Sequence, residues 1–141
     1  MFRYINKQSI AGFIGNDPVI RYLPSGTAVL ELRVATTSSW KKGDEWQSHT
    51  EWHNCVFYKK LAEEVIELYK KGQGIFIEGR SLTRKWVSNT DGFERTRKEV
   101  IVDSHFPIRY EPTSKTKEQI PTPPAEEIPE VVEAATGYDT L

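Results

Sequence analysis

The run Thr50–Tyr58 limits the possible folds more than any other segment, because its large side chains alternate in the manner of a β-strand. Successive side chains of a strand point to opposite faces. The two faces are Trp52, Asn54, Val56 and Tyr58 on one side, and His53, Cys55 and Phe57 on the other. Burial in a hydrophobic core would explain one aromatic ring on the first face. Two rings beside a polar Asn54, with Lys59 and Lys60 next along the chain, are typical of a surface on which bases stack.

The segments around this strand predict further strands and one helix. Apolar and charged residues alternate over 28–34, which is the pattern of a half-buried strand. Residues 60–71 instead carry apolar side chains at helical spacing, and Gly72 follows where a helix C-cap glycine belongs. The other predicted strands cover 5–14, 75–80 and the two arms of a hairpin, 82–87 and 95–102, on either side of the turn-rich segment 89–92.

The order of these elements is three strands, one helix and two or more strands. We therefore predict an all-β protein with one helix, on the plan of the OB-fold, a five-stranded Greek-key barrel. An SH3-like barrel has similar content, but a helix of about three turns at this place favours the OB-fold. The polar residues 37–49, with Gly43 and Asp44 at their middle, are expected to form a mobile loop that carries Trp40 and Trp46.

Charge divides the chain into a body and a tail. Residues 1–110 carry 17 Lys and Arg against 13 Asp and Glu, a net charge of +4, whereas residues 111–141 carry 2 against 7, a net charge of −5. The tail also holds five of the eight prolines and one of the 16 aromatic residues, so it cannot bury enough apolar surface to offset the entropy of ordering. We predict one domain over 1–110 and a disordered, acidic, Pro-rich tail over 111–141.

A series of short motifs runs in order along residues 5–105. They are Asn6-Lys7, Gly15-Asn16-Asp17-Pro18, Arg21-Tyr22-Leu23-Pro24-Ser25-Gly26, Ala35-Thr36, Trp40, Thr50-Glu51-Trp52-His53, Lys60-Leu61-Ala62-Glu63, Lys71-Gly72, Ile77-Glu78-Gly79-Arg80 and Thr83-Arg84-Lys85-Trp86. As an ordered set they are specific, and the body resembles the bacterial-type single-stranded DNA-binding proteins. The resemblance implies an OB-fold homotetramer that binds and protects single-stranded DNA without sequence preference during replication, recombination and repair.

The resemblance also implies roles for individual residues. Trp40, Trp52 and Trp86 fall where the family places base-stacking tryptophans, and Tyr58 falls where it places a stacking phenylalanine. His53 matches a histidine that the family uses at a subunit interface.

Basic residues supply the second kind of candidate contact. Four assembled bodies would give a basic shared surface that attracts phosphates. The favoured phosphate contacts are Lys7, Arg21, Arg33, Arg84 and Lys85. Trp46 has no counterpart in the family, and it is equally well interpreted as a loop anchor or as a DNA contact.

The end of the chain departs from the resemblance. Family members commonly finish in a short acidic tip with a terminal aromatic residue, which recruits replication and repair enzymes. This chain instead finishes in residues 135–141, with Asp139 as the one acid. We therefore expect the tail to bind such partners poorly.

Other classes of function have little support in the sequence. His49, Glu51, His53 and Cys55 share one strand face, but that face is expected to meet the core or a neighbour, so we predict no metal and no cofactor. No paired acidic motif, phosphate-binding loop or nucleophile elbow is recognisable, so we predict no enzymatic activity.

A single cysteine suits a reducing compartment, and no apolar run approaches the ~18 residues that a membrane helix needs. The resemblance implies a cytoplasmic, nucleoid-associated location in a bacterium. Two alternative functions remain open. One is a primosome-type adaptor that uses the same fold to dock proteins, and the other is an RNA-binding module.

Overall fold

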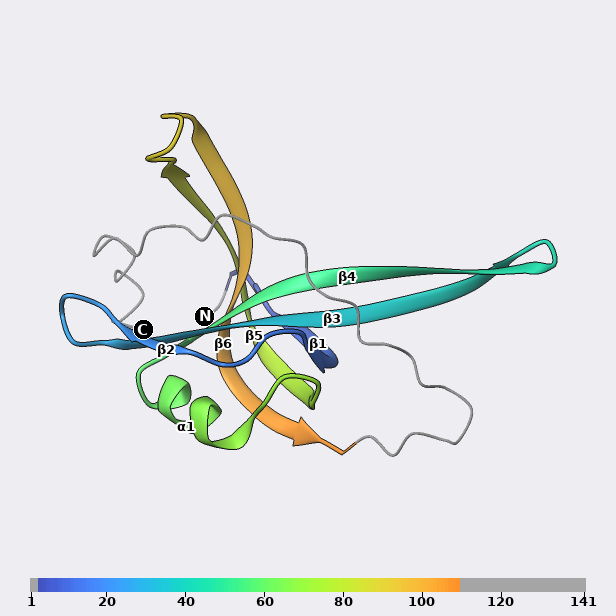
Figure 1. Ribbon diagram of the computed structural model, residues 1–141, viewed down its shortest axis with the longest axis horizontal. Helices are drawn as coiled ribbons and strands as arrows, with labels where there is room; N and C mark the ends of the chain where they lie inside the picture. Colours follow the sequence, from blue (N-terminus) through green and yellow to red (C-terminus); the bar gives the residue numbers. More distant parts are fainter. Residues whose placement is uncertain (1–2, 110–141) are drawn as a thin grey trace.

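The computed structural model describes residues 3–109, which form six strands and one helix. The elements are β1 (Gln8–Ile14), β2 (Ile20–Tyr22), β3 (Ala28–Lys42), β4 (Glu45–Tyr58), α1 (Lys60–Leu68), β5 (Gly74–Val87) and β6 (Glu94–Ile108). The strands curl into a barrel with α1 at one end, and the β3–β4 and β5–β6 hairpins project from it in different directions (Figure 1).

The strand order confirms the predicted OB-fold. Neighbours follow the order β1-β5-β6-β4-β3-β2, and an additional pairing of β1 with β3 closes a barrel of five strands. Strands β4 and β6 run parallel, whereas the other pairs are antiparallel. The sixth strand, β2, has three residues and pairs only with the edge of β3, so it adds to the barrel without closing it.

The barrel interior takes one side of each strand, as the alternation in the sequence predicts. Cys55 and Phe57 are fully buried in the main core, together with Leu30 and Leu32 from β3. The opposite side of the sheet is not exposed to solvent over its whole area. A smaller apolar cluster lies there, formed by Leu23, Val29, Val56 and Ile101, and Tyr58 and Leu82 pack against it.

The prediction of a mobile loop over 37–49 is wrong. Strands β3 and β4 pair without interruption from Val29↔Tyr58 to Lys42↔Glu45, and only the turn at Gly43 and Asp44 separates them. Gly43 adopts a positive φ of 65°, which favours glycine in a tight turn. The sequence does not predict this hairpin, because both of its faces are exposed to water and no apolar residues alternate along it.

Four other boundaries differ from the predictions. Strand β6 runs over Glu94–Ile108, whereas its predicted range is 95–102. Strand β1 begins at Gln8 rather than at residue 5, and β5 is continuous through 74–87 with a bulge at Glu78/Gly79. The helix ends at Leu68, and Gly72 lies in the following turn with a φ of 90° rather than at the cap. Residues 60–71 do not all continue the helix because Tyr69 turns extended and buries its ring against His105.

The contact between α1 and β6 is polar as well as aromatic. The Tyr69 hydroxyl lies 3.0 Å from Nδ1 of His105, whose Nε2 lies 3.4 Å from a carboxylate oxygen of Glu64. Burial raises the pKa of Tyr69 to about 12, so this hydroxyl keeps its proton and can donate it to His105. The predicted disordered tail, residues 111–141, lies outside the described residues.

Candidate nucleic-acid interface

One face of the sheet brings together three of the four predicted stacking rings. Trp52 and Tyr58 belong to the same face of β4, and both are half-buried. Trp86 reaches this face from β5, since Arg84, two residues earlier, donates a hydrogen bond to the Tyr58 hydroxyl. We call this the outer face, because its other side is the barrel core.

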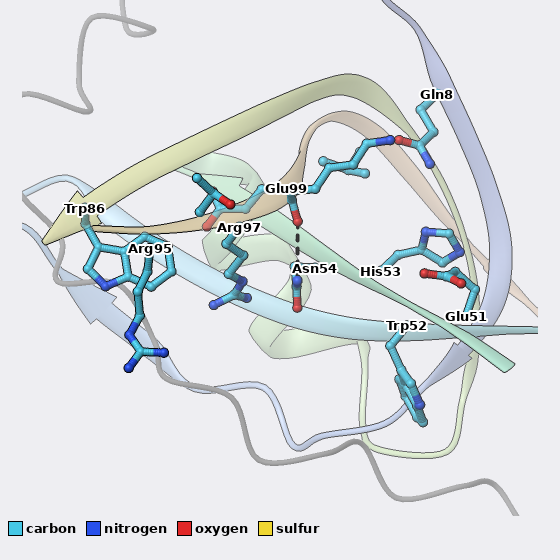
Figure 2. Close-up of a pocket in the computed structure, with 12 residues that line it drawn as sticks. Gln8, Glu51, Trp52, His53, Asn54, Trp86, Arg95, Arg97 and Glu99 are labelled. Carbon is cyan, nitrogen blue, oxygen red and sulfur yellow. Dashed lines mark hydrogen bonds between the residues drawn. The ribbon is translucent and has the colours of Figure 1, made fainter. Parts of the chain in front are cut away.

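Trp52 and Trp86 lie at opposite ends of a groove of about 730 Å³ (Figure 2). The remaining lining residues are Gln8, Glu51, His53, Asn54, Arg95, Thr96, Arg97, Lys98, Glu99 and Val100. The groove thus combines two indoles with two arginines, a lysine and two glutamates, of which Glu99 pairs with Arg84. Rings beside cationic side chains suit a chain of bases and phosphates.

Gly15 and Arg33 determine the position of the Trp52 ring. The Arg33 guanidinium carbon lies 5.8 Å from the centre of the indole, within cation–π range. A Cβ added to Gly15 would lie only 2.4 Å from the far edge of the ring, so glycine is required for this close approach. Trp52 is therefore supported from below while part of its surface remains accessible.

The loop after β1 holds Gly15 in place through the backbone of β3. Gly15 donates its N–H to the carbonyl of Arg33 at 2.8 Å, and the Asn16 side chain accepts the N–H of Arg33 at 2.7 Å. The Asn16 amide also donates to the carbonyl of Glu31 at 3.2 Å. This accounts physically for the Gly15-Asn16 motif, which is one of those that carry the family resemblance.

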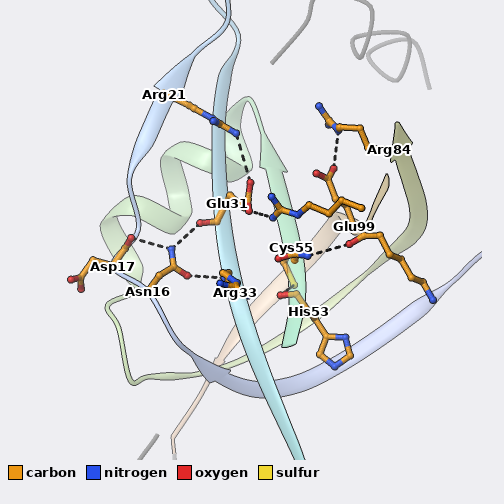
Figure 3. A network of polar contacts seen from close by, with 12 residues as sticks. Asn16, Asp17, Arg21, Glu31, Arg33, His53, Cys55, Arg84 and Glu99 are labelled. Atoms are coloured by element: carbon orange, nitrogen blue, oxygen red, sulfur yellow. Dashed lines mark hydrogen bonds and ion pairs between the residues drawn. The ribbon is translucent and has the colours of Figure 1, made fainter. Parts of the chain in front are cut away.

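A buried ion pair fixes Tyr58. Arg84 donates from Nε to Glu99 at 3.2 Å and from Nη2 to the Tyr58 hydroxyl at 3.1 Å, and Glu99 is 2% exposed (Figure 3). Burial lowers the pKa of Arg84, but Glu99 and Tyr58 raise it by more, so the guanidinium stays charged. Burial raises the pKa of Glu99 despite the opposing effect of Arg84 and Arg97.

A second ion-pair group lies beside the first. The Glu31 carboxylate pairs with Arg97 through one oxygen and lies 3.7 Å from Arg21 through the other (Figure 3). Arg97 is buried, whereas Arg21 is half-exposed. Arg21, Arg84 and Arg97 are therefore held in place by carboxylates before any ligand arrives.

The five predicted phosphate contacts fall in different surroundings. Lys85 is exposed on β5, and Lys7 is exposed but lies 3.1 Å from a carboxylate oxygen of Glu78. Arg33 lies over Trp52 and Arg21 pairs with Glu31. Arg84 has little exposed surface, because it pairs with Glu99. The structure thus gathers Arg21, Arg33 and Arg84 on the outer face.

Sequence reasoning missed Arg97 and Glu99 as parts of this surface. Both lie on β6 with Arg95, at alternate positions, and Arg95 is the cross-strand neighbour of Trp86. The sequence identifies Asn54 only as a polar residue between two rings. Its amide donates to the carbonyl of Lys98 at 3.3 Å, which ties β4 to β6 under the groove. The alternation Arg95, Arg97, Glu99 is the signal that could have indicated a charged strand face.

His53 lies on the other face of β4 from Trp52. Its Nε2 is 2.8 Å from the Thr36 hydroxyl, and burial lowers its pKa, an effect that Lys98 adds to and Glu51 opposes. The neighbouring His49 contacts Glu51 at 3.2 Å, and Cys55 is buried, which raises its thiol pKa. Within residues 3–109 no group of three or more His, Cys, Asp or Glu side chains is arranged to hold a metal ion.

The β3–β4 hairpin carries the remaining two tryptophans on opposite faces. Trp40 is directly opposite Gln47, and Trp46 is opposite Lys41. Because the pairing is uninterrupted, alternation assigns Trp46 to the outer face with Trp52, and Trp40 to the face of His53. The structure therefore separates Trp40 from the other three predicted stacking rings.

Replacing Gly15 by Ala is expected to displace the Trp52 ring without unfolding the protein, because the clashing atoms are at the far end of a side chain. The shift should change Trp fluorescence and weaken single-strand binding. Gly12→Ala is the comparison, since its Cβ would lie 2.1 Å from the backbone oxygen of Ala35 and should lower the thermal midpoint markedly. Thermal unfolding and fluorescence of both variants test this, and equal destabilisation by the two substitutions would contradict it.

Comparisons with known proteins agree with this geometry. A family model described as the single-strand binding protein family matches residues 5–107. A similar solved structure is the SSB of Plasmodium falciparum in complex with single-stranded DNA, with 27% sequence identity, a TM-score of 0.67, and coverage of 77% of this chain and 99% of that chain. No helix among the described residues is long and apolar enough to cross a membrane. Because the family match spans most of the sequence, the chain belongs to the single-strand binding protein family, whose function is to bind single-stranded DNA.

Proposed function

We propose that the outer face is the surface on which this protein binds single-stranded DNA without sequence preference. The observation that carries this proposal is the groove with Trp52 and Trp86 at its ends and Arg95, Arg97 and Lys98 along its walls. Stacking on an aromatic ring is available to every base, so rings of this kind bind tightly without selecting a sequence. The protein acts by binding, and it needs no catalytic residue or cofactor.

Tyr58 extends the stacking surface beyond the groove, since Arg84 holds its hydroxyl and leaves the ring half-buried. We assign phosphate contacts to Arg21, Arg33, Arg84, Lys85 and Lys7. Arg84 and Arg21 would then each contact a carboxylate of the protein and a phosphate of the DNA. The carboxylate fixes the position of the guanidinium but weakens its attraction to the phosphate. We assign Trp40 to contact with a part of the DNA that passes round the β3–β4 hairpin, because Trp40 lies on the opposite face from Trp52.

We also propose that four copies assemble. Phe76 and Phe106 stack at a centroid distance of 4.5 Å on the barrel exterior, and Phe106 is 54% exposed. Such an exposed apolar pair is suited to contact with another copy. His53, half-buried beside Thr36, is assigned to a subunit contact. Roles in replication, recombination and repair, and a cytoplasmic, nucleoid-associated location, accord with this function.

The test is a titration of intrinsic fluorescence with poly(dT) at several salt concentrations, beside sedimentation of the free protein. We expect strong quenching by poly(dT), none by duplex DNA, and a mass of four chains. Affinity should fall by roughly 0.7 log units per log of salt for each phosphate neutralised.

Competing outcomes are distinguishable in the same assay. Tighter binding of an oligouridylate than of an oligothymidylate of equal length would indicate an RNA-binding module. Absence of binding to both the oligothymidylate and the oligouridylate would contradict the proposed function and favour a protein-docking adaptor. Sedimentation as a monomer would remove the assembly proposal and leave the DNA-binding proposal to the titration.

A further inference from the structure

The two faces of the β3–β4 hairpin are chemically different beyond the barrel. Side-chain contacts confirm the assignment of faces: the hydroxyls of Thr37 and Thr50 meet at 2.9 Å on the outer face, and Thr36 meets His53 on the other. Each face carries one indole and one lysine near the tip. Trp46 is paired across the strands with Lys41, whereas Trp40 shares its face with Lys42.

Carboxylates lie on only one of these two faces. Glu45 and Glu51 are on the face of Trp40, where Glu45 is directly opposite Lys42 and Glu51 contacts His49. On the outer face the path from Trp52 to Trp46 passes small polar side chains, which are Thr37, Ser39, Ser48 and Thr50. Arg33 and Lys41 lie at the two ends of this path, and no Asp or Glu of the paired strands lies between them. The outer face therefore attracts phosphates, and the other face is close to neutral.

Trp46 is also the more accessible of the two indoles. It is 74% exposed, compared with 45% for Trp40. It is six residues from Trp52 along β4, about 20 Å at the usual rise of a strand. Twist turns the hairpin gradually, but it does not exchange the faces of a regular strand. A chain of nucleotides leaving Trp52 can thus follow the outer face outwards to Trp46.

We propose that Trp46 is a further base-stacking position and that Lys41 is its phosphate contact. The pair extends the DNA path from the groove along the outer face of the hairpin. This inference rests on the proposed function. Trp46 and Lys41 would let this chain hold more of the DNA strand than the rings at Trp52, Tyr58 and Trp86 can hold.

The experiment compares Trp46→Ala, Trp46→Phe and wild type in binding poly(dT) and a short oligothymidylate that fills only the groove. Trp46→Ala should weaken poly(dT) binding by about 5- to 150-fold and leave the short oligonucleotide unaffected. Trp46→Phe keeps a ring, so it should retain most of the affinity while losing part of the fluorescence quenching. Lys41→Gln should reduce the salt slope by about 0.7.

Gln47→Ala is the matched control, because Gln47 is adjacent to Trp46 but belongs to the other face. It should bind as wild type does. Wild-type affinity of Trp46→Ala for poly(dT), in a protein that Trp52→Ala weakens, would overturn the inference and leave the proposed function intact. Equal loss with both oligonucleotides would also overturn it, since Trp46 would then act on the groove. No binding by wild type would refute both proposals.

Discussion

Replacing Trp52 by Ala should weaken binding to poly(dT) by about 5- to 150-fold, the equivalent of ~1–3 kcal/mol for one stacked base. The ring is half-buried between Gly15 and Arg33 at one end of the groove, so its loss removes a stacking surface and also the cation–π contact with Arg33. The effect should be larger in the double variant with Trp86→Ala, since this removes the rings at both ends. Fluorescence anisotropy of a labelled oligothymidylate measures both.

The fold should survive Trp52→Ala, because the main core lies on the opposite side of β4. Circular dichroism and the unfolding midpoint provide the control. Trp52→Phe, which keeps an aromatic ring, should recover a substantial part of the affinity. An unfolded Trp52→Ala variant would show that this ring belongs to the core, and an unchanged affinity would contradict its assignment to base contact.

Replacing Arg84 by Met should lower the free energy of unfolding by up to ~3–5 kcal/mol at neutral pH, because it leaves the buried carboxylate of Glu99 without its closest positive partner. Arg97 remains near Glu99 and reduces this cost. The same substitution removes the hydrogen bond to the Tyr58 hydroxyl. Chemical denaturation of the wild type and the variant measures the difference.

The pH dependence of this variant follows from the direction of the Glu99 pKa. Burial raises that pKa above its ordinary value, and Arg84 opposes the rise. Without Arg84 the pKa rises further, so the folded variant holds the proton at higher pH than the unfolded chain does. Its deficit in stability should therefore be largest at neutral pH and shrink as pH falls through the raised pKa.

The double variant Arg84→Met with Glu99→Gln separates charge from packing. It removes the uncompensated carboxylate, so it should regain much of the lost stability at neutral pH and lose the acid dependence. A deficit in Arg84→Met that is the same at neutral and mildly acidic pH would contradict this account. It would indicate that Arg84 stabilises the fold through packing of its aliphatic stem rather than through its charge.

Local patterns in the sequence are sufficient to predict the strands of the barrel. The alternation over 28–34 and 50–58 predicts strands whose inner residues, such as Leu32 and Phe57, are buried in the core. A half-buried strand carries this signal because one side of it excludes water. The order of elements around the single helix is enough to predict the barrel, and the pairing of β1 with β3, which closes it, confirms the prediction.

The same local patterns do not predict a strand whose two faces are both exposed to water. Residues 37–49 were predicted to be a loop because nothing in their composition distinguishes an exposed hairpin from an exposed loop. Cross-strand pairing decided the matter, and with it the faces of the two indoles. Trp40 and Trp46 are equivalent in the sequence as exposed aromatic residues near lysines. The register of β3 against β4 is what places Trp46, and not Trp40, on the face of Trp52.

By itself the sequence predicted the barrel and its single helix and placed Trp52 and Tyr58 on one face of a strand, because alternation and spacing are properties of a local segment. Only the tertiary structure decided which charges meet. Glu31 of β3 pairs with Arg97 of β6, and Arg84 of β5 pairs with Glu99 of β6, so both ion pairs depend on how β3, β5 and β6 are arranged around β4. An ion pair between residues far apart in the chain leaves no periodic trace in the sequence, since the two charges attract each other only when folding has brought them together, and that attraction must offset the cost of removing both from water.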